Sequence, residues 1–320
     1  MLPDQHSPLV PDNQPLLVIL GPTASGKTQL ATQLALELGG EVISADSRQV
    51  YRGMDIGTGK DLADYMINSK QIPYHLIDVV EAGEAYHLFQ YQQEVQKVLN
   101  GIRQRDKVPI LCGGSGLYIE AVIKQFQFTG IPIDEALRTH LHAKTDQELS
   151  ILFKQFVSAY TPLADTSTRK RLIRAIEIGR FLQANPTVQF SDQPPLHYQV
   201  FGIGLPTDLR RERITQRLYL RLQQGMVEEV RRLIEQGLTP DQLIYYGLEY
   251  KFITQYVLGE LTHETMVERL NVAIHQFAKR QMTFFRKMER DGISIHWLDG
   301  TKEISVMVQE VLNLYNASLR

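Results

Sequence analysis

Cysteine is almost absent from this 320-residue sequence, which contains a single one, Cys112. One cysteine excludes an intramolecular disulfide and a cysteine-ligated zinc site, and it is typical of proteins of the reducing cytosol. No run approaches the roughly 18 apolar residues that a membrane-spanning helix needs. Residues 1–15 lack the basic start and apolar core of a signal peptide, and we expect them to be a disordered lead. We therefore expect a cytoplasmic protein.

A surplus of charge of either sign is also lacking. Lys and Arg number 34 against 36 Asp and Glu, which gives a formal net charge of -2. Taken alone, this balance argues against a nucleic-acid partner, because such partners favour basic proteins. The hydrophobic fraction of 43% and the charged fraction of 22% are those of a globular protein with one large or two modest domains.

Short apolar runs alternate with helical patterns in the first part of the chain. Residues 16–20 form an apolar run that ends at Gly21, which is typical of a buried parallel strand. Further elements are predicted as a helix over 27–38, a strand over 41–45, a strand over 74–80, a helix over 86–102 and a strand over 108–112. The alternation predicts an α/β fold with a doubly wound parallel sheet, similar to that of P-loop NTPases.

The pattern changes after residue 125. Residues 126–197 show almost no strand pattern and predict a helical insert, whereas 198–205 are a candidate for the last strand of the sheet. Long amphipathic helices are predicted over 207–290, with breaks at Gly225, Gly237 and Gly247. Three parts are predicted after the lead. Residues 16–125 and 198–298 form a catalytic core that includes the C-terminal helices. Residues 126–197 are the helical insert, and residues 299–320 are a C-terminal tail.

A phosphate-binding loop follows the first predicted strand. Residues 21–28 read GPTASGKT and match G-x-x-x-x-G-K-[ST], the nucleotide-binding P-loop motif, between a strand and a helix as the motif requires. Its backbone N–H groups and the helix N-terminus attract anions, a lysine adds a positive charge, and a threonine hydroxyl can bind Mg²⁺. The motif predicts diphosphate binding by Gly21, Thr23, Ala24, Ser25, Gly26, Lys27 and Thr28, with Thr28 as the Mg²⁺ ligand.

Two acids directly follow predicted strand residues. Asp46 comes after the run at 42–45, and Asp78 follows Leu76 and Ile77. The carboxyl ends of parallel strands face the ligand crevice, so either acid could bind Mg²⁺ or act as a general base. Asp78 could equally be a strand-end or capping acid.

A series of motifs resembles the tRNA dimethylallyltransferases, also called tRNA isopentenyltransferases or the IPP transferase family. After the P-loop, the motifs are DSRQVYRGMDIGTGK at 46–60, HLID at 75–78, GGSGLY at 113–118, RLIRAIE at 171–177, RITQR at 213–217 and AKRQMTFFR at 278–286. The resemblance implies transfer of a dimethylallyl group from dimethylallyl diphosphate to the exocyclic amine of the adenosine 3′ to the tRNA anticodon. Diphosphate is released, and Mg²⁺ is required.

The resemblance also implies catalytic roles. Asp46 matches the catalytic aspartate, which accepts a proton from the weakly nucleophilic adenine amine. Ser115 stands where the family usually has Thr, and its hydroxyl can donate to the oxygen that leaves with the diphosphate. Arg217 matches the arginine that neutralises the diphosphate. Ser115 could equally cap a helix, and Arg217 could be a surface residue.

The resemblance also implies contacts to tRNA, in three segments of the chain and at the pair Tyr250-Lys251. Enzymes that act on a base take it out of the stack, and the expected contacts are Asp46, Ser47, Arg48, Gln49, Lys170, Arg171, Arg174, Tyr250, Lys251, Lys279, Arg280, Gln281, Thr283 and Arg286. Residues 169–180 hold five basic side chains against one acid, and residues 279–287 hold four and none. These local basic surfaces overturn the argument from net charge. We expect the protein to act as a monomer.

Two departures from the family pattern affect segments that face tRNA. Glu249 replaces Gly in a Gly-Tyr-Lys step, and Ser167-Thr168 replaces Asn-Asp. Three alternatives stay open: a P-loop kinase with Asp78 as Mg²⁺ ligand, a dimethylallyltransferase of free adenine nucleotides, and a non-catalytic tRNA-binding protein. A kinase or a free-nucleotide transferase has no need of the basic C-terminal helix.

Overall fold

The computed structural model describes residues 14–158, 160–186, 188 and 194–318. The described residues divide into two compact units: residues 14–125 and 195–318 form the larger unit, and the described residues between 126 and 194 form the smaller. Most of the predicted disordered lead, residues 1–13, lies outside the described residues. Within the described ranges, no helix combines the length and apolar character needed to cross a membrane.

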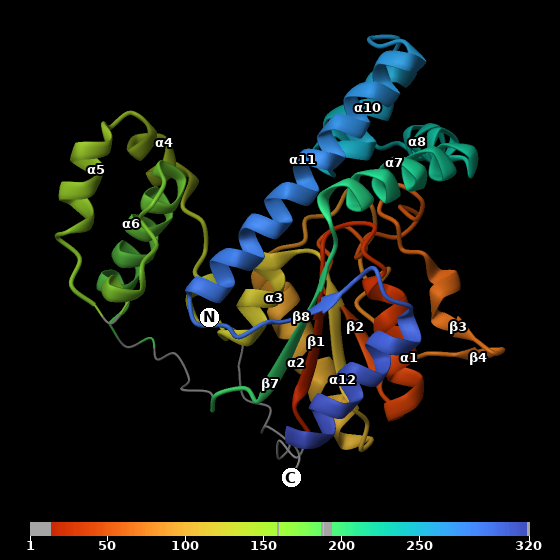
Figure 1. The fold of residues 1–320 in the computed structure, drawn as a ribbon. Helices are drawn as coiled ribbons and strands as arrows, with labels where there is room; N and C mark the ends of the chain where they lie inside the picture. Colours follow the sequence, from red (N-terminus) through yellow and green to blue (C-terminus); the bar gives the residue numbers. More distant parts are fainter. Residues whose placement is uncertain (1–13, 159, 187, 189–193, 319–320) are drawn as a thin grey trace. The chain divides into compact units, whose positions relative to one another are not determined.

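A six-stranded sheet is the centre of the larger unit (Figure 1). The order is β5-β2-β6-β1-β7-β8, and every pairing in it is parallel. The strands are β1 (Leu16–Leu20), β2 (Glu41–Ser44), β5 (Tyr74–His75), β6 (Pro109–Gly113), β7 (Tyr198–Gly204) and β8 (His296–Asp299). The predicted doubly wound parallel sheet is confirmed, and β1 lies inside it between β6 and β7.

Both faces of the sheet are covered by helices, because successive side chains of a strand point to opposite faces. Leu17 and Ile19 of β1 pack with α1 (Lys27–Leu38) and α12 (Ile304–Ser318), which lie side by side in Figure 1. Leu16, Val18 and Leu20 pack in the opposite core. That core includes α2 (Leu88–Gln104), α3 (Gly116–Ile123), α7 (Thr207–Gln223), α8 (Met226–Glu235), α9 (Pro240–Tyr245), α10 (Leu248–Val257) and α11 (His263–Arg290).

Helices are the regular secondary structure of the smaller unit in its described part. It contains α4 (Glu135–His142), α5 (Asp146–Phe153) and α6 (Arg169–Ala184), together with the 3-10 turns η2 (Phe128–Gly130) and η3 (Thr161–Leu163). Leu137, Leu149 and Ile176 join the three helices in one apolar cluster. A buried carboxylate, Glu177, accepts hydrogen bonds of 2.8 and 2.9 Å from Arg138.

Several elements differ from the sequence-based predictions. The strand expected over 74–80 stops at His75, because Leu76 and Asp78 have φ values of 61° and 57°, which extended backbone excludes. Strand β8 extends the sheet beyond β7, which is therefore not the last strand. The predicted tail over 299–320 contains α12, a core helix. Residues 62–71, where no element was predicted, form η1 (Leu62–Tyr65) and the hairpin of β3 (Met66–Ile67) and β4 (Lys70–Gln71).

Candidate active site

The phosphate loop joins the end of β1 to the start of α1. Ala24 and Gly26 have φ values of 61° and 86°, and such left-handed residues turn successive backbone N–H groups toward one concave surface. A Cβ at Gly21 would lie 2.6 Å from Ser25 Oγ, so a side chain there would clash with the loop. The Ser25 hydroxyl is buried and has no hydrogen-bond partner among the described residues. The loop therefore presents donors that fit an anion.

Lys27 lies at the start of α1 and points back over this loop. Its Nζ donates to the Pro22 carbonyl at 3.4 Å. Burial lowers the pKa of Lys27, the charge of Arg217 lowers it further, and Cys112, Asp46 and Asp61 oppose the shift. The Arg217 guanidinium lies 3.2 Å from the Thr23 hydroxyl, which places this predicted catalytic residue at the phosphate loop.

Asp46 and Ser115 lie where the ends of β2 and β6 meet. The Asp46 carboxylate accepts a hydrogen bond from the Arg48 backbone N–H at 2.9 Å. The Ser115 hydroxyl accepts one from the Ser47 N–H at 3.1 Å, and the Ser115 N–H donates to the Ala45 carbonyl at 3.2 Å. Although Ser115 occupies the N-cap position of α3, its side chain makes no capping bond. Its hydroxyl instead faces the segment that carries Asp46.

Glycines are required at this junction because the two strand ends approach closely. A Cβ at Gly113 would lie 2.1 Å from the Ala45 carbonyl oxygen, and one at Gly114 would lie 2.4 Å from Gln281 Nε2. Both distances are too short for a real side chain. The Gly-Gly-Ser sequence therefore allows Asp46 and Ser115 to lie next to each other.

Gln281 connects this junction to the phosphate loop. Its Oε1 accepts a hydrogen bond of 2.9 Å from the Thr23 N–H, and its Nε2 donates to the Gly114 carbonyl at 2.9 Å. Only 7% of the residue is exposed. The Gln281 amide is buried and occupied on both sides, and it fixes the loop against the turn, while the contact of Gln281 with tRNA stays a prediction.

Helix α7 contributes two arginines, Arg217 and Arg221, to the site. Arg217 donates to the Thr23 hydroxyl at 3.2 Å and pairs with Asp61. One turn later, Arg221 lies beside it against Gly59 and faces Glu249, with Nη1 and Oε1 3.9 Å apart. Sequence reasoning missed Arg221, although its i,i+4 spacing from Arg217 places both on one face of α7.

Asp78 and Tyr250 both have partners within the fold. The buried ammonium group of Lys60 lies between Asp55 and Asp78 and pairs with both acids. The Tyr250 hydroxyl donates to Glu229 at 2.7 Å, and Glu229 also accepts three backbone N–H groups of residues 55–57. Tyr250 is 1% exposed, and its contact with tRNA stays a prediction.

The remaining predicted tRNA residues divide into occupied and exposed groups. Gln49 is occupied: it accepts from the Ser44 hydroxyl at 2.9 Å and donates to the Gly59 carbonyl at 3.0 Å. Arg48 lies over the ring of Tyr245. Arg174 is engaged within the smaller unit, where it donates to the Ile131 carbonyl at 2.6 Å. The exposed residues are Lys170, Arg171, Lys251, Lys279, Arg280, Thr283 and Arg286.

Two details qualify the predicted basic surfaces. Thr168 caps α6, because its side chain accepts the Arg171 N–H at 3.3 Å, and this accounts for a hydroxyl residue at one departure from the family pattern. Lys287, on the basic face of α11, donates to both oxygens of the buried Glu120 at 2.8 and 2.9 Å. Lys287 is therefore engaged within the fold, unlike the exposed basic residues of the same helix.

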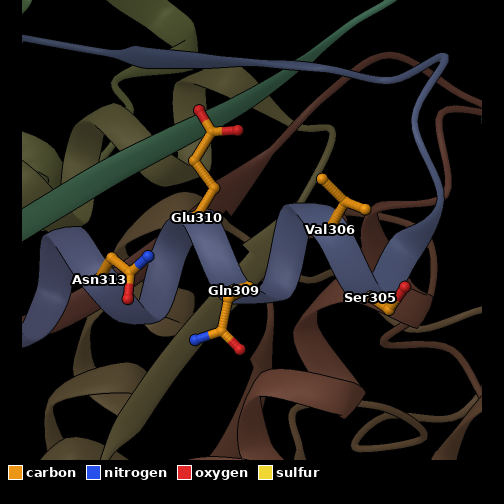
Figure 2. Close-up of a pocket in the computed structure, with 5 residues that line it drawn as sticks. All are labelled: Ser305, Val306, Gln309, Glu310 and Asn313. Atoms are coloured by element: carbon orange, nitrogen blue, oxygen red, sulfur yellow. The ribbon is translucent and has the colours of Figure 1, made fainter.

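A surface depression elsewhere in the larger unit is not part of this site. Figure 2 shows that a single helix, α12, supplies its lining side chains, which are Ser305, Val306, Gln309, Glu310 and Asn313. None of these is a predicted site residue. Glu310 is also committed to His296, which is 2.9 Å away.

Comparison with known proteins gives concordant matches. The family model described as IPP transferase matches residues 49–288. The tRNA dimethylallyltransferase 1 of Parabacteroides distasonis is 50% identical over 305 residues, which cover 95% of this chain and 98% of that protein. The tRNA dimethylallyltransferase 1 of Porphyromonas gingivalis is 49% identical and is covered along 100% of its length.

Solved structures share the fold. The full-length tRNA isopentenylpyrophosphate transferase from Bacillus halodurans superposes with a TM-score of 0.70 at 29% identity, covering 96% of this chain and 97% of that one. A eukaryotic dimethylallyltransferase acting on tRNA also gives a TM-score of 0.70, at 23% identity, covering 90% of this chain and 74% of that one. At that identity the second likeness concerns the fold alone.

Replacing Gln281 with Leu tests the bridge between the phosphate loop and the Gly-Gly-Ser turn. The variant leaves the Thr23 N–H and the Gly114 carbonyl unpaired, and we expect the free energy of unfolding to fall by about 2 kcal/mol in urea titrations. Inorganic diphosphate should also bind more weakly. Gln276→Leu, at an exposed position of the same helix, is the matched control. Unchanged stability with a loss of tRNA affinity alone would contradict the bridging role and favour Gln281 as a tRNA contact.

Proposed function

The chain belongs to the IPP transferase family, and on this premise we propose that it transfers a dimethylallyl group from dimethylallyl diphosphate to tRNA. The acceptor is the exocyclic amine of the adenosine 3′ to the anticodon, and diphosphate is released. One observation carries this proposal: the phosphate loop and the strand ends that hold Asp46 and Ser115 are joined in one site, since Gln281 binds both the Thr23 N–H and the Gly114 carbonyl. A leaving group and a proton acceptor are thereby held together.

The phosphate loop and Arg217 serve the leaving diphosphate. As the bond between carbon and oxygen breaks, its electron pair goes to the diphosphate, and the growing negative charge meets Lys27, the backbone N–H groups and Arg217. The Arg217 guanidinium already contacts the loop at Thr23, 3.2 Å away. The Ser115 hydroxyl accepts the Ser47 N–H, so its own proton is free to be donated to the departing oxygen.

Asp46 serves the nucleophile. The lone pair of an adenine amine is delocalised into the ring, and transfer of its proton to a carboxylate during attack makes it available for the new bond between nitrogen and carbon. One Asp46 oxygen is held by the Arg48 N–H at 2.9 Å, which fixes the carboxylate while the other oxygen can face the base. Asp46 thus orients the amine and accepts its proton.

Magnesium fits the donors at the loop. Thr28 lies in the first turn of α1 with a half-buried hydroxyl, the kind of oxygen ligand that Mg²⁺ accepts beside phosphate and water. Among the described residues there is no group of three or more acidic, His or Cys side chains that could hold a metal ion. Thr28 would therefore hold Mg²⁺ together with the diphosphate. Bound there, the ion neutralises phosphate charge.

A P-loop kinase is the less favoured alternative. Such an enzyme would need Asp78 to hold its metal ion, but Asp78 is paired with the buried Lys60. We further propose that the protein acts as a monomer in the cytoplasm, where its tRNA substrate resides and where the buried, unpaired Cys112 stays reduced.

The proposed activity is tested by incubating the protein with MgCl₂, labelled dimethylallyl diphosphate and unmodified tRNA. We expect label at the adenosine 3′ to the anticodon, identified by nucleoside analysis, and none in a tRNA with guanosine at that position. Label in free adenosine monophosphate instead of tRNA would indicate a free-nucleotide transferase. ATP turnover without tRNA would indicate a kinase.

Asp46→Asn should lower the transfer rate by a factor of roughly 10² or more, because the amide cannot accept the proton. We expect little change in tRNA affinity, measured by filter binding. Asp64→Asn, which removes another partly buried carboxylate of the same unit, should keep most of the activity. A nearly normal rate in Asp46→Asn would exclude Asp46 as the base.

The exposed pair Lys279 and Arg280 should contact tRNA phosphates. Replacing both with Ala is expected to weaken tRNA binding and to reduce the slope of log affinity against log salt concentration by one to two. The control Arg231→Ala with Arg232→Ala removes the same charge from exposed positions on α8. An unchanged salt slope, or an equal loss in the control, would argue against localised contacts on α11.

A further inference from the structure

The guanidinium groups of Arg217 and Arg221, both on α7, lie close to each other next to Gly59. A Cβ built at Gly59 would lie 1.5 Å from Arg221 Nη2 and 2.7 Å from Arg217 Nη2. A side chain at Gly59, whose φ of 64° favours glycine, would displace these guanidinium groups, and the two cations are neighbours beside it. Because Arg217 also contacts Thr23 of the phosphate loop, an anion bound at that loop lies within reach of this pair.

Arg221 is buried without enough partners. Only 8% of the residue is exposed, and its Nε, which carries a proton, has no hydrogen-bond partner among the described residues. The Glu249 carboxylate faces it, but Nη1 and Oε1 are 3.9 Å apart, which is too far for a hydrogen bond. A buried guanidinium with an unused donor is costly unless a ligand completes its partners.

The charges around Arg221 also favour an incoming anion. Burial and then the charge of Arg217 lower the pKa of Arg221 to about 10, against the opposing effects of Glu249 and Asp61. The guanidinium therefore remains charged at neutral pH and is repelled by its neighbour. An anion placed between the two arginines would relieve this repulsion, as bidentate arginine groups do with phosphates.

We propose that Arg221 is a second arginine for the diphosphate and that Glu249 is its counter-charge when no diphosphate is bound. The proposal rests on the proposed function, which supplies the diphosphate of dimethylallyl diphosphate as the ligand. It also gives a role to Glu249, the residue that replaces the family's glycine. The Glu249 carboxylate faces Arg221, with Oε1 3.9 Å from Nη1, so it borders the site on the side of this arginine.

Opposite effects on anion binding are therefore expected at the two positions. Removing Arg221 takes away a ligand, whereas removing the charge of Glu249 takes away an anion that competes for Arg221. If the pair only stabilised the fold, both single variants would be destabilised and the double variant would recover. The double variant thus separates binding of the diphosphate from a merely structural ion pair.

Inorganic diphosphate is the probe, titrated by calorimetry at constant MgCl₂ into the full chain. The variants are Arg221→Met, Glu249→Gln and the double variant, with Arg211→Met as the control for loss of an exposed arginine from the same helix. Urea titrations of each variant report folding. Glu249→Gln is expected to bind diphosphate at least as tightly as the unmodified protein, and the double variant at least about tenfold more weakly than Glu249→Gln.

A smaller difference than tenfold between Glu249→Gln and the double variant would overturn the proposal, as would equal weakening in Arg211→Met. In transfer assays, the double variant should show a raised KM for dimethylallyl diphosphate and an unchanged KM for tRNA. The calorimetric result does not depend on tRNA or on group transfer. Absence of transfer activity would therefore contradict the proposed function, while diphosphate binding alone would still decide the role of Arg221.

Discussion

The close approach of β2 and β6 at their carboxyl ends is the contact on which the site depends. At Gly113 there is no room for a Cβ, which would lie 2.1 Å from the Ala45 carbonyl oxygen. This contact places Asp46 beside Ser115, whose hydroxyl accepts the Ser47 N–H. Through Gly114 and the buried amide of Gln281, the same junction is tied to Thr23 of the phosphate loop. Three loops of a parallel sheet thereby act as one rigid site, as transfer between two fixed groups requires.

The basic side chains of this site lie next to acidic ones, so the site combines both signs of charge and has no large excess of positive charge. Lys27, Arg217 and Arg221 lie close to the carboxylates of Asp46, Asp61 and Glu249, and each cation is influenced by at least one of these acids. Such an arrangement keeps the net charge of the whole chain near zero while the loop stays attractive to a diphosphate. The exposed basic residues of α11 add a separate surface, which we propose binds the larger substrate, tRNA. A near-neutral protein can therefore bind two polyanions.

Much of the fold was predictable because its signals are local. Helix α1 has the predicted bounds, Lys27–Leu38, and the P-loop lies between a strand and a helix as its motif requires. Other elements depend on tertiary contacts. Strand β8 has only four residues and is defined by pairing with β7, whereas the left-handed backbone at Leu76 and Asp78 ended a strand that the apolar pattern favoured. Short strands and local backbone turns leave little trace in periodicity.

Individual site residues were harder to predict than the family. The motifs identified the loop, Asp46, Ser115 and Arg217, but they do not distinguish a polar side chain that faces a ligand from one that satisfies the core. Gln281 and Tyr250 are polar residues within or beside motifs, yet their partners are backbone groups or a buried carboxylate distant in sequence. Arg221, by contrast, lies outside the RITQR motif, so no motif pointed to it. Its place in the site became evident from its position next to Gly59.

The most direct test of the account is a crystal structure of the protein with a tRNA anticodon stem-loop, MgCl₂ and a non-transferable dimethylallyl thiodiphosphate. We expect the diphosphate in the loop of residues 21–28, with Arg217 and Arg221 on its oxygens. The flipped adenosine should present its exocyclic amine to the Asp46 carboxylate at hydrogen-bond distance. An amine directed away from Asp46, or a diphosphate bound outside this loop, would contradict the account.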